Sequence, residues 1–325
     1  MRAILVDEST RDMSIGEVAD PVPRDHELLV RVKATAVNRA DLLQRYGKYP
    51  PPPGASPIIG LEMAGVVEKV GSGIIDWQIG DRVCALLPGG GYAEKAVIPA
   101  EMAIPIPDNL SYEEAAAVPE VFLTAYLNLF MLGHMKAGEF VLIHAGASGV
   151  GTAAIQLVRE AGAIPIATAG SDTKLQACRT LGAQHVVNYR GESIASRVQE
   201  YTAGRGVSLI LDPVGASYWE ANTEGIAVDG RWVIIGGLGG QVIDRFNFQV
   251  FMQKRIQLIF STLRSRSEED KIELTKQFLA FAQERLATGA LQPIIDKVYD
   301  WSDVMEAHEH MKQNRNIGKI VLTVS

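Results

Sequence analysis

The chain has 325 residues, of which 47% are hydrophobic and 21% charged, with a net charge of −7 and two cysteines. This length allows two domains of an ordinary globular protein, and the negative charge argues against a nucleic-acid-binding surface. No apolar run is long enough to span a membrane and two cysteines cannot build a disulfide framework, so we expect a cytoplasmic protein without a signal peptide.

Short strand patterns interrupted by proline and glycine fill the first part of the chain. We expect strands over residues 1–6, 27–37, 64–70, 82–87 and 92–98. Tyr49 precedes four consecutive prolines. These must be extended, because proline fixes φ and has no N–H to donate. The sequence therefore predicts a β-rich domain over residues 1–118.

A glycine-rich turn follows an apolar run at residues 141–143. Gly146, Gly149 and Gly151 lie in the turn, and a second apolar run covers residues 164–168. The helix expected between them has an apolar face made of Ala154, Leu157, Val158 and Ala161. This order is typical of a βαβ dinucleotide-binding unit, in which backbone N–H groups at a helix N-terminus approach a pyrophosphate.

Helix and strand patterns alternate from about residue 119 onward. We expect helices over 171–181, 192–201 and 218–227, strands over 186–188, 207–212, 232–236 and 255–260, and a long helix over 267–287. Strand, helix and strand then follow over 294–299, 301–313 and 319–324. Such alternation predicts a doubly wound parallel sheet. We assign residues 119–266 to a nucleotide-binding domain and expect residues 267–325 to return to the first domain.

Several motifs spread over the whole chain resemble those of the medium-chain dehydrogenase/reductase superfamily. They are NRAD (38–41), GLEMAG (60–65), GDRV (80–83), LPGGG (87–91), AAAVP (115–119), HAGASGVG (144–151) and NIGKIV (316–321). YPPPPG (49–54) and TAGSDTK (168–174) resemble its zeta-crystallin-like quinone oxidoreductase branch. The resemblance implies an α/β fold with a GroES-like catalytic domain and a Rossmann domain, an active-site cleft between them, and a homodimer.

The residues do not favour a zinc site. Zinc-dependent members of the superfamily carry Cys and His where this chain has Asn38 and Leu61, so only Glu62 of that cluster remains. A catalytic zinc needs about three protein ligands. His308 and His310 are two apart on an expected helix and point to different sides, as surface histidines would. We therefore expect no metal.

The residues after the second Rossmann strand favour NADPH. NAD-preferring sites place a carboxylate at the end of this strand, whereas here Gly170 and Ser171 follow it and Lys174 lies in the next helical turn. A hydroxyl, an ammonium, the phenol of Tyr189 and a helix N-terminus can bind a 2′-phosphate, and the resemblance implies that they do. Ser171 could instead serve only as a helix cap, and the carboxylate of Asp172 lies nearby.

Other cofactor contacts are implied by the resemblance. They are Asn38, Thr124, Gly146, Ala147, Ser148, Gly149, Val150, Gly151, Gly170, Gly236, Gly237, Leu238, Leu263 and Asn316. The cluster at residues 236–240 could also be only the turn that any such domain needs.

Two hydroxyl groups are candidates for catalysis. Ser148 lies in the glycine turn, where it could reach a substrate oxygen or simply form the turn. Tyr49 precedes the rigid proline run, and the resemblance favours a phenol at the cleft over a packing role. A hydroquinone anion is stabilised by resonance, so reduction of a quinone needs only modest acid help. Cys84, on an expected strand without a cationic neighbour, is predicted to be a buried, inert thiol.

Three functions remain open. The first is zinc-independent transfer of reducing equivalents from NADPH to a quinone, with ortho-quinones among the candidate substrates. The second is NADPH-dependent reduction of an enal or enone double bond. The third, from a different class, is a nucleotide-binding structural or RNA-interacting protein like some crystallins, against which the net charge argues.

Overall fold

The computed structural model describes residues 1–325, which form two compact units. Unit 1 comprises Met1–Leu123 and Leu263–Ser325, and unit 2 comprises Thr124–Thr262. The chain thus leaves unit 1 once and returns to it, with changes at 123/124 and 262/263, where the sequence indicated 118/119 and 266/267. None of the helices has the length and apolar character needed to cross a membrane.

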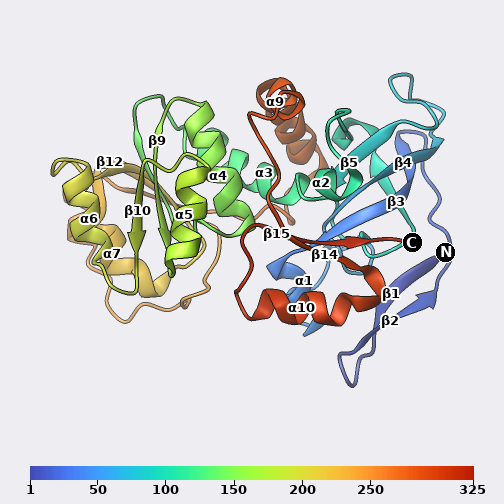
Figure 1. Ribbon diagram of the computed structural model, residues 1–325, viewed down its shortest axis with the longest axis horizontal. Coiled ribbons are helices and arrows are strands. Elements are labelled where there is room, and N and C mark those ends of the chain that lie inside the picture. Colours follow the sequence, from blue (N-terminus) through green and yellow to red (C-terminus); the bar gives the residue numbers. More distant parts are fainter. The chain divides into compact units, whose positions relative to one another are not determined.

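The main sheet of unit 1 has seven strands. Their order is β14-β15-β3-β4-β5-β7, with β6 paired to β3. The bounds are β3 (Glu27–Val37), β4 (Glu62–Val70), β5 (Arg82–Leu86), β6 (Lys95–Pro99), β7 (Ile104–Pro105), β14 (Ile295–Asp300) and β15 (Lys319–Thr323). β1 (Arg2–Val6) and β2 (Met13–Glu17) form a separate antiparallel pair. Because β15 pairs antiparallel with β3, the C-terminal segment is part of the same sheet (Figure 1).

The helices of unit 1 begin at polar caps. They are α1 (Arg39–Arg45), α2 (Tyr112–Ala116), α9 (Glu268–Ala287) and α10 (Val304–Lys312). Ser111 and Ser267 accept hydrogen bonds from backbone N–H groups in the first turns of α2 and α9, which satisfies donors that have no partner within the helix. Helix α3 (Pro119–Tyr126), followed by a π-helical stretch at Leu127–Leu132, carries the chain from unit 1 into unit 2.

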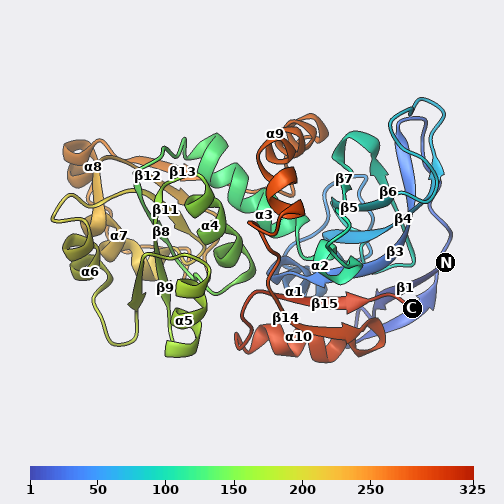
Figure 2. The same ribbon diagram turned by 45° about the horizontal axis from the view of Figure 1, so that its top comes forward.

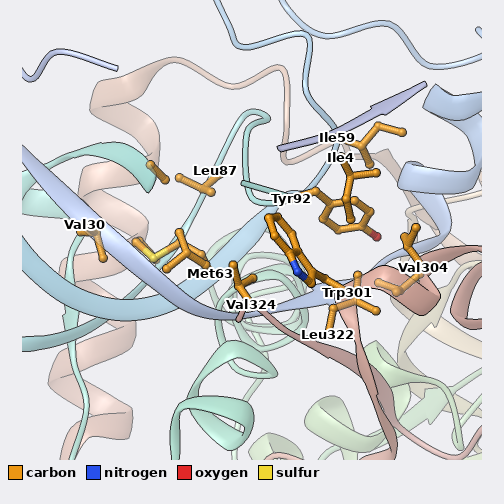
Figure 3. Packing of buried hydrophobic residues seen from close by; sticks show 14 of the residues in the cluster. Ile4, Val30, Ile59, Met63, Leu87, Tyr92, Trp301, Val304, Leu322 and Val324 are labelled. Carbon is orange, nitrogen blue, oxygen red and sulfur yellow. The ribbon is translucent and has the colours of Figure 1, made fainter. Parts of the chain in front are cut away.

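The core of unit 1 joins residues that lie far apart in the sequence. Figure 3 shows the rings of Tyr92 and Trp301 among Ile4, Val304 and Leu322. Both rings are almost completely buried, at 0% and 1% exposure. Burying an aromatic side chain contributes roughly 1.5–3 kcal/mol relative to exposure. This cluster ties β1 and the segment that precedes α10 to the main sheet.

Unit 2 is a doubly wound parallel sheet. Its strand order is β10-β9-β8-β11-β12-β13, and all neighbouring pairs are parallel. The strands are β8 (Phe140–Ile143), β9 (Ile164–Ala169), β10 (His185–Asn188), β11 (Val207–Asp212), β12 (Ile226–Ile234) and β13 (Gln257–Phe260). The helices are α4 (Gly149–Glu160), α5 (Asp172–Thr180), α6 (Ile194–Tyr201), α7 (Trp219–Gly225) and α8 (Phe248–Lys254). Helices cover both faces of the sheet (Figures 1 and 2).

The order of the strands places the candidate nucleotide site. Counted from β8, the order is the 3-2-1-4-5-6 arrangement in which dinucleotides bind outside the carboxyl ends of the strands, where the order reverses. The fold is therefore the expected α/β combination, with a Rossmann-type sheet in unit 2.

Several short elements differ from the sequence prediction. Helices α1, α2, α3 and α8 and strands β2 and β7 were not predicted, because elements of two to eight residues carry too little periodicity to distinguish them from loops. The strand expected over 92–98 lies at Lys95–Pro99, since Tyr92 packs in the core before the strand begins. The strand expected to end at residue 236 ends at Ile234, and Gly236 belongs to the following turn.

Candidate active site

The glycine turn of unit 2 has no room for side chains at two positions. A Cβ at Gly151 would collide with the Ala145 carbonyl oxygen, and one at Gly146 would lie 2.8 Å from the Ala167 Cβ. Ser148 is the N-cap of α4, and its Oγ accepts a hydrogen bond from the Gly151 N–H at 3.0 Å. The hydroxyl hydrogen of Ser148 is therefore still available as a donor. The turn brings backbone N–H groups to the start of α4, as a pyrophosphate site requires.

A buried polar network lies behind this turn. The Asn222 Nδ2 donates to Asp212 Oδ2 at 3.1 Å, so Asn222 Oδ1 must accept from His144 Nε2, 2.7 Å away. This leaves His144 Nδ1 to accept from the Thr168 hydroxyl at 3.1 Å. Burial lowers the pKa of His144, which keeps the ring neutral. The network links the ends of β8, β9 and β11 with hydrogen bonds.

Asp212 extends the same network to β12 and to the next turn. Its Oδ2 also accepts from Trp232 Nε1 at 3.0 Å, and its Oδ1 accepts from the N–H groups of Val214 and Gly215. Asp212 is completely buried, and both of its carboxylate oxygens have partners. A fully satisfied buried network fixes one geometry, because each lost bond would leave a buried polar group unpaired.

The residues expected at a 2′-phosphate lie around the end of β9. Ser171 is the N-cap of α5 and accepts from the Lys174 N–H at 3.4 Å. The Tyr189 hydroxyl lies next to the backbone of Gly170, where a Cβ would collide with it. Arg190 belongs to the same group, with its Nε 3.2 Å from that Cβ position. No carboxylate lies within the last residues of β9, although Asp172 begins α5.

The second glycine cluster borders a cavity of about 780 Å³ within unit 2. Gly236, Gly237 and Gly240 line it together with apolar side chains that include Trp219 and Phe246. Leu238, predicted to contact the cofactor, is 61% exposed and is not part of the lining.

Unit 1 has a buried ion pair between Glu62 and Lys319. The Lys319 Nζ lies 2.8 Å from Glu62 Oε1, and both residues are almost inaccessible, at 2% and 0% exposure. Asn38 bridges them, because its Oδ1 accepts from Lys319 at 2.6 Å and its Nδ2 donates to Glu62 at 2.8 Å. The other oxygen of Glu62 accepts from the Glu120 N–H at 2.8 Å.

No three His, Cys, Asp or Glu side chains lie close enough together to hold a metal ion. The Lys319 ammonium supplies the positive charge next to Glu62, so that carboxylate is neutralised by the protein itself. Leu61 is buried, at 2% exposure, and offers no ligand atom.

Asp41, Tyr92 and His308 form a second buried group beside this pair. The Tyr92 hydroxyl lies 3.2 Å from Asp41 Oδ2 and 3.1 Å from His308 Nε2. Burial raises the pKa of Asp41 to about 7 and lowers that of His308 to about 3. The expectation that His308 lies on the surface is wrong, because it faces the core of unit 1 at 1% exposure. His310 is partly buried and bonds to Tyr299 and Asp296.

Tyr49 is half-buried and lies against a guanidinium group. Arg264 is centred 5.2 Å from the Tyr49 ring and donates through Nη1 to the Tyr49 carbonyl oxygen at 3.2 Å. Burial raises the pKa of the Tyr49 phenol and the nearby Glu120 raises it further, whereas Arg264 acts in the opposite direction. Burial also raises the pKa of Glu120, to about 8.

The remaining predicted residues are divided between the two units. Asn38, Tyr49, Leu263 and Asn316 belong to unit 1, and Thr124 belongs to unit 2 with the glycine turns. Asn316 donates to the Gly318 carbonyl oxygen at 2.7 Å, three residues before Lys319. Cys84 is buried as predicted, and burial raises the pKa of its thiol, which disfavours the reactive thiolate.

Several polar residues of the site were not predicted. They are Glu120, His144, Asp212, Asn222, Arg264 and Lys319. Asp212 carried a usable signal, since a carboxylate at the end of a strand followed by Pro-Val-Gly favours a turn that binds backbone N–H groups. The others pair with residues far away in the sequence, which spacing alone does not reveal.

Two family models match the chain. One, an alcohol dehydrogenase GroES-like domain, matches residues 24–108. The other, a zinc-binding dehydrogenase, matches residues 149–280. Among curated relatives, human quinone oxidoreductase is 30% identical over 308 residues, which cover 94% of this chain and 92% of that protein.

Another relative is longer than this chain. The zebrafish synaptic vesicle membrane protein VAT-1 homolog is 31% identical over 319 residues, which are 93% of this chain and 65% of that protein. The chain therefore spans about two thirds of the length of this relative.

Solved structures of similar proteins cover the whole chain. Escherichia coli quinone oxidoreductase complexed with NADPH has a TM-score of 0.87 at 30% identity, with 99% of both chains covered. An NAD-dependent alcohol dehydrogenase has a TM-score of 0.88 at 30% identity, and the CurK enoyl reductase has 0.88 at 27%. Both matches cover 100% of this chain. They cover 100% of the alcohol dehydrogenase chain and 99% of the CurK chain.

Proposed function

The chain belongs to the medium-chain dehydrogenase/reductase superfamily and to its quinone-oxidoreductase-like family, and from this premise we propose that it is an NADPH-dependent quinone reductase that works without zinc. The observation that carries the proposal is the Lys319–Glu62 pair bridged by Asn38. With that carboxylate neutralised by an ammonium, no Lewis acid polarises the substrate. The acceptor must then be one whose reduced form is already stabilised, as a hydroquinone anion is.

The polar residues around Gly170 support NADPH as the cofactor. Ser171 is the N-cap of α5, Lys174 lies in the first turn of that helix, and the Tyr189 hydroxyl lies beside Gly170 at the end of β9. A phosphate dianion at this point gains charge-assisted hydrogen bonds and the favourable end of the helix dipole. The E. coli relative, complexed with NADPH, points in the same direction. When bound, the cofactor supplies the hydride.

Residues of this chain bind and orient the reactants. The glycine turn holds the pyrophosphate, and Ser148 donates its free hydroxyl hydrogen toward the cofactor or the substrate oxygen. Tyr49 donates from its phenol to the substrate oxygen on which negative charge develops, and the adjacent guanidinium of Arg264 favours loss of that proton. Flat substrates fit this chemistry best, and ortho-quinones present two adjacent oxygens to such donors.

Reduction of an enal or enone is the second candidate. The similarity to the CurK enoyl reductase favours it, because that protein shares the fold over the whole chain. Here the hydride would go to a carbon atom, and the neighbouring carbon would need a full proton. Tyr49 would then be indispensable, whereas a quinone would need it only for hydrogen bonding.

The edge of the sheet in unit 2 supports a homodimer. Strand β13 lies at the end of this sheet, so one side of its backbone has no strand partner within the chain. Phe260, at the end of β13, and Met252, on the preceding helix α8, are 71% and 70% exposed, and unpaired edges with apolar side chains favour association. The expected cytoplasmic location stays a prediction.

A comparison of two acceptors with two variants tests this proposal. Tyr49→Phe and Ser148→Ala should each lower kcat/KM for an ortho-quinone, and Tyr49→Phe alone should nearly abolish any enone turnover. General acid catalysis contributes typically ~10²–10⁴-fold. Wild-type turnover of enones but not of quinones would replace the first candidate by the second. Unchanged kcat/KM in the double variant would remove both residues from the mechanism.

A further inference from the structure

Arg264 is the first polar side chain after the chain re-enters unit 1 at Leu263, and it is almost completely buried, at 6% exposure. Its guanidinium donates hydrogen bonds to three separate segments. Nε donates to the Pro88 carbonyl oxygen at 2.8 Å, Nη1 to the Tyr49 carbonyl oxygen at 3.2 Å, and Nη2 to Gln44 Oε1 at 2.7 Å. Arg264 and these three segments all belong to unit 1.

The partners of Arg264 are themselves held in place. Gln44, on α1, also donates through Nε2 to the Pro57 carbonyl oxygen at 3.0 Å, so hydrogen bonds hold both ends of the segment 49–57 that contains the proline run. Lys271, buried at 8% exposure, donates from Nζ to the Arg264 carbonyl oxygen at 2.8 Å. The guanidinium therefore lies in a rigid frame of α1, α9, the proline run and the turn at Pro88.

The proline run has few other bonds of its own. Prolines 50–53 and Pro57 have no N–H, and Ala55 to Pro52 is the only backbone hydrogen bond within residues 49–57. The Tyr49 ring stands 5.2 Å from the Arg264 guanidinium carbon, at cation–π distance. Arg264 thus contacts both the carbonyl group and the ring of Tyr49.

We propose that Arg264 is a positioning residue that holds the Tyr49 phenol in the orientation required for donation to the substrate. This role rests on the proposed function, because it acts through Tyr49. Only a planar fork with several fixed N–H groups can bind three divergent acceptors and cover a ring at once. An ammonium at the same place keeps the charge but cannot keep the geometry.

Kinetics of four proteins test the coupling. Arg264→Lys should lower kcat/KM with an ortho-quinone by about 10²-fold, the order expected when a reacting group is misplaced by about 1 Å. The same change in a Tyr49→Phe background should cost less than threefold, because there is no longer a phenol to position. Arg266→Lys, two residues away and paired only with exposed Asp270, is the matched control and should stay at the wild-type rate. Losses from Arg264→Lys and Tyr49→Phe that simply multiply would overturn the proposal.

Amide hydrogen exchange supplies a readout that does not depend on turnover. Arg264→Lys should raise the exchange rates in peptides covering residues 46–60, with peptides of β3 and β4 unchanged. Gln44→Ala, on half-exposed α1, should raise the same rates by a smaller amount if Arg264→Lys fails to fold. Unchanged exchange over residues 46–60 in both variants would refute the positioning role of Arg264. If the wild type does not turn over a quinone but the variants show these exchange changes, only the proposed function is refuted. The contact of Arg264 with residues 46–60 would then still stand.

Discussion

At the scale of single residues, the buried charges of unit 1 determine how this fold responds to mutation. Glu62 and Lys319 are removed from water, and their mutual attraction together with the bonds to Asn38 offsets the loss of hydration. Such a pair contributes little net stability compared with apolar residues, but breaking it leaves one charge buried without compensation.

Lys319→Met should therefore destabilise the protein by about 3–5 kcal/mol, measured by urea unfolding. Glu62→Gln combined with Lys319→Met should recover much of that loss, because no isolated charge remains. Lys276→Met, which breaks a pair with Glu101 in which both side chains are more than half exposed, is the control and should cost below about 1 kcal/mol. An equal loss in the single and double variants would contradict this account.

Asp41 makes stability depend on pH. Burial raises its pKa from 3.8 to about 7, so the folded state binds a proton that the unfolded state has lost between these values. Its contribution is therefore fully present below pH 3.8 and disappears as the pH rises through about 7. Between these two pH values the free energy of unfolding changes by about 4 kcal/mol, at ~1.4 kcal/mol per pH unit.

Asp41→Asn should remove this contribution to the pH dependence of the free energy of unfolding while keeping the shape of the side chain. Unfolding free energies at pH 5 and pH 8 should then differ less in the variant than in the wild type. Asp108→Asn, at an exposed turn, is the control and should leave the wild-type slope unchanged. An unaltered slope in Asp41→Asn would show that the carboxyl ionises normally.

Not every residue of the site was predictable from the sequence. Ser171 is the helix cap that its position before Asp172 indicated, and the capping geometry is purely local. His308, in contrast, was expected at the surface, because helical spacing says which residues share a face but not which face is buried. Its environment is decided by Tyr92, 216 residues away in the sequence. Arg264 escaped prediction for the same reason.

At the scale of elements, the glycine turn and its helices were the most predictable part. An apolar strand, a glycine turn and an amphipathic helix are each encoded within about 20 residues, and β8, α4 and β9 lie where the pattern indicated. Helix α1 was missed, because its seven residues follow β3 after the single N-cap residue Asn38, whose side chain is bonded to Glu62 and Lys319.

The N-terminus of α5 should decide the choice of cofactor. Lys174→Gln removes one cation from the proposed 2′-phosphate site, and hydrogen bonds to charged groups contribute about 1.5–3 kcal/mol. The dissociation constant for NADPH should therefore rise about 10-fold to 100-fold, while that for NADH stays within twofold. Fluorescence titration measures both constants.

Lys136→Gln is the control for this substitution, since Lys136 is an exposed lysine of the same unit. It should leave both dissociation constants unchanged. A parallel loss of NADPH and NADH affinity in Lys174→Gln would show that the lysine does not read the phosphate.

At the scale of the whole molecule, the sequence indicated that the tail would return to the first domain, and β15 pairs with β3 in unit 1. The pairing partner itself could not be read from periodicity, because periodicity indicates where a strand lies but not which strand it pairs with. The exact residues at which the chain changes units were less predictable, because α3 runs continuously through the first change.

The proposed dimer should depend on the edge of unit 2. Phe260→Glu together with Met252→Glu places charges on that edge and should convert a species of twice the chain mass into one of single mass in light scattering. Ile75→Glu, at a residue of unit 1 that is 92% exposed, is the control and should leave the mass unchanged. A wild-type protein of single mass would contradict the dimer.

The most direct test of the central claim is NADPH oxidation, followed at 340 nm after addition of an ortho-quinone, in the presence of a metal chelator and with NADH compared in parallel. We predict rapid oxidation of NADPH that the chelator does not affect, and slow oxidation of NADH. Tight NADPH binding with no quinone-dependent oxidation, or activity that the chelator abolishes, would contradict the account.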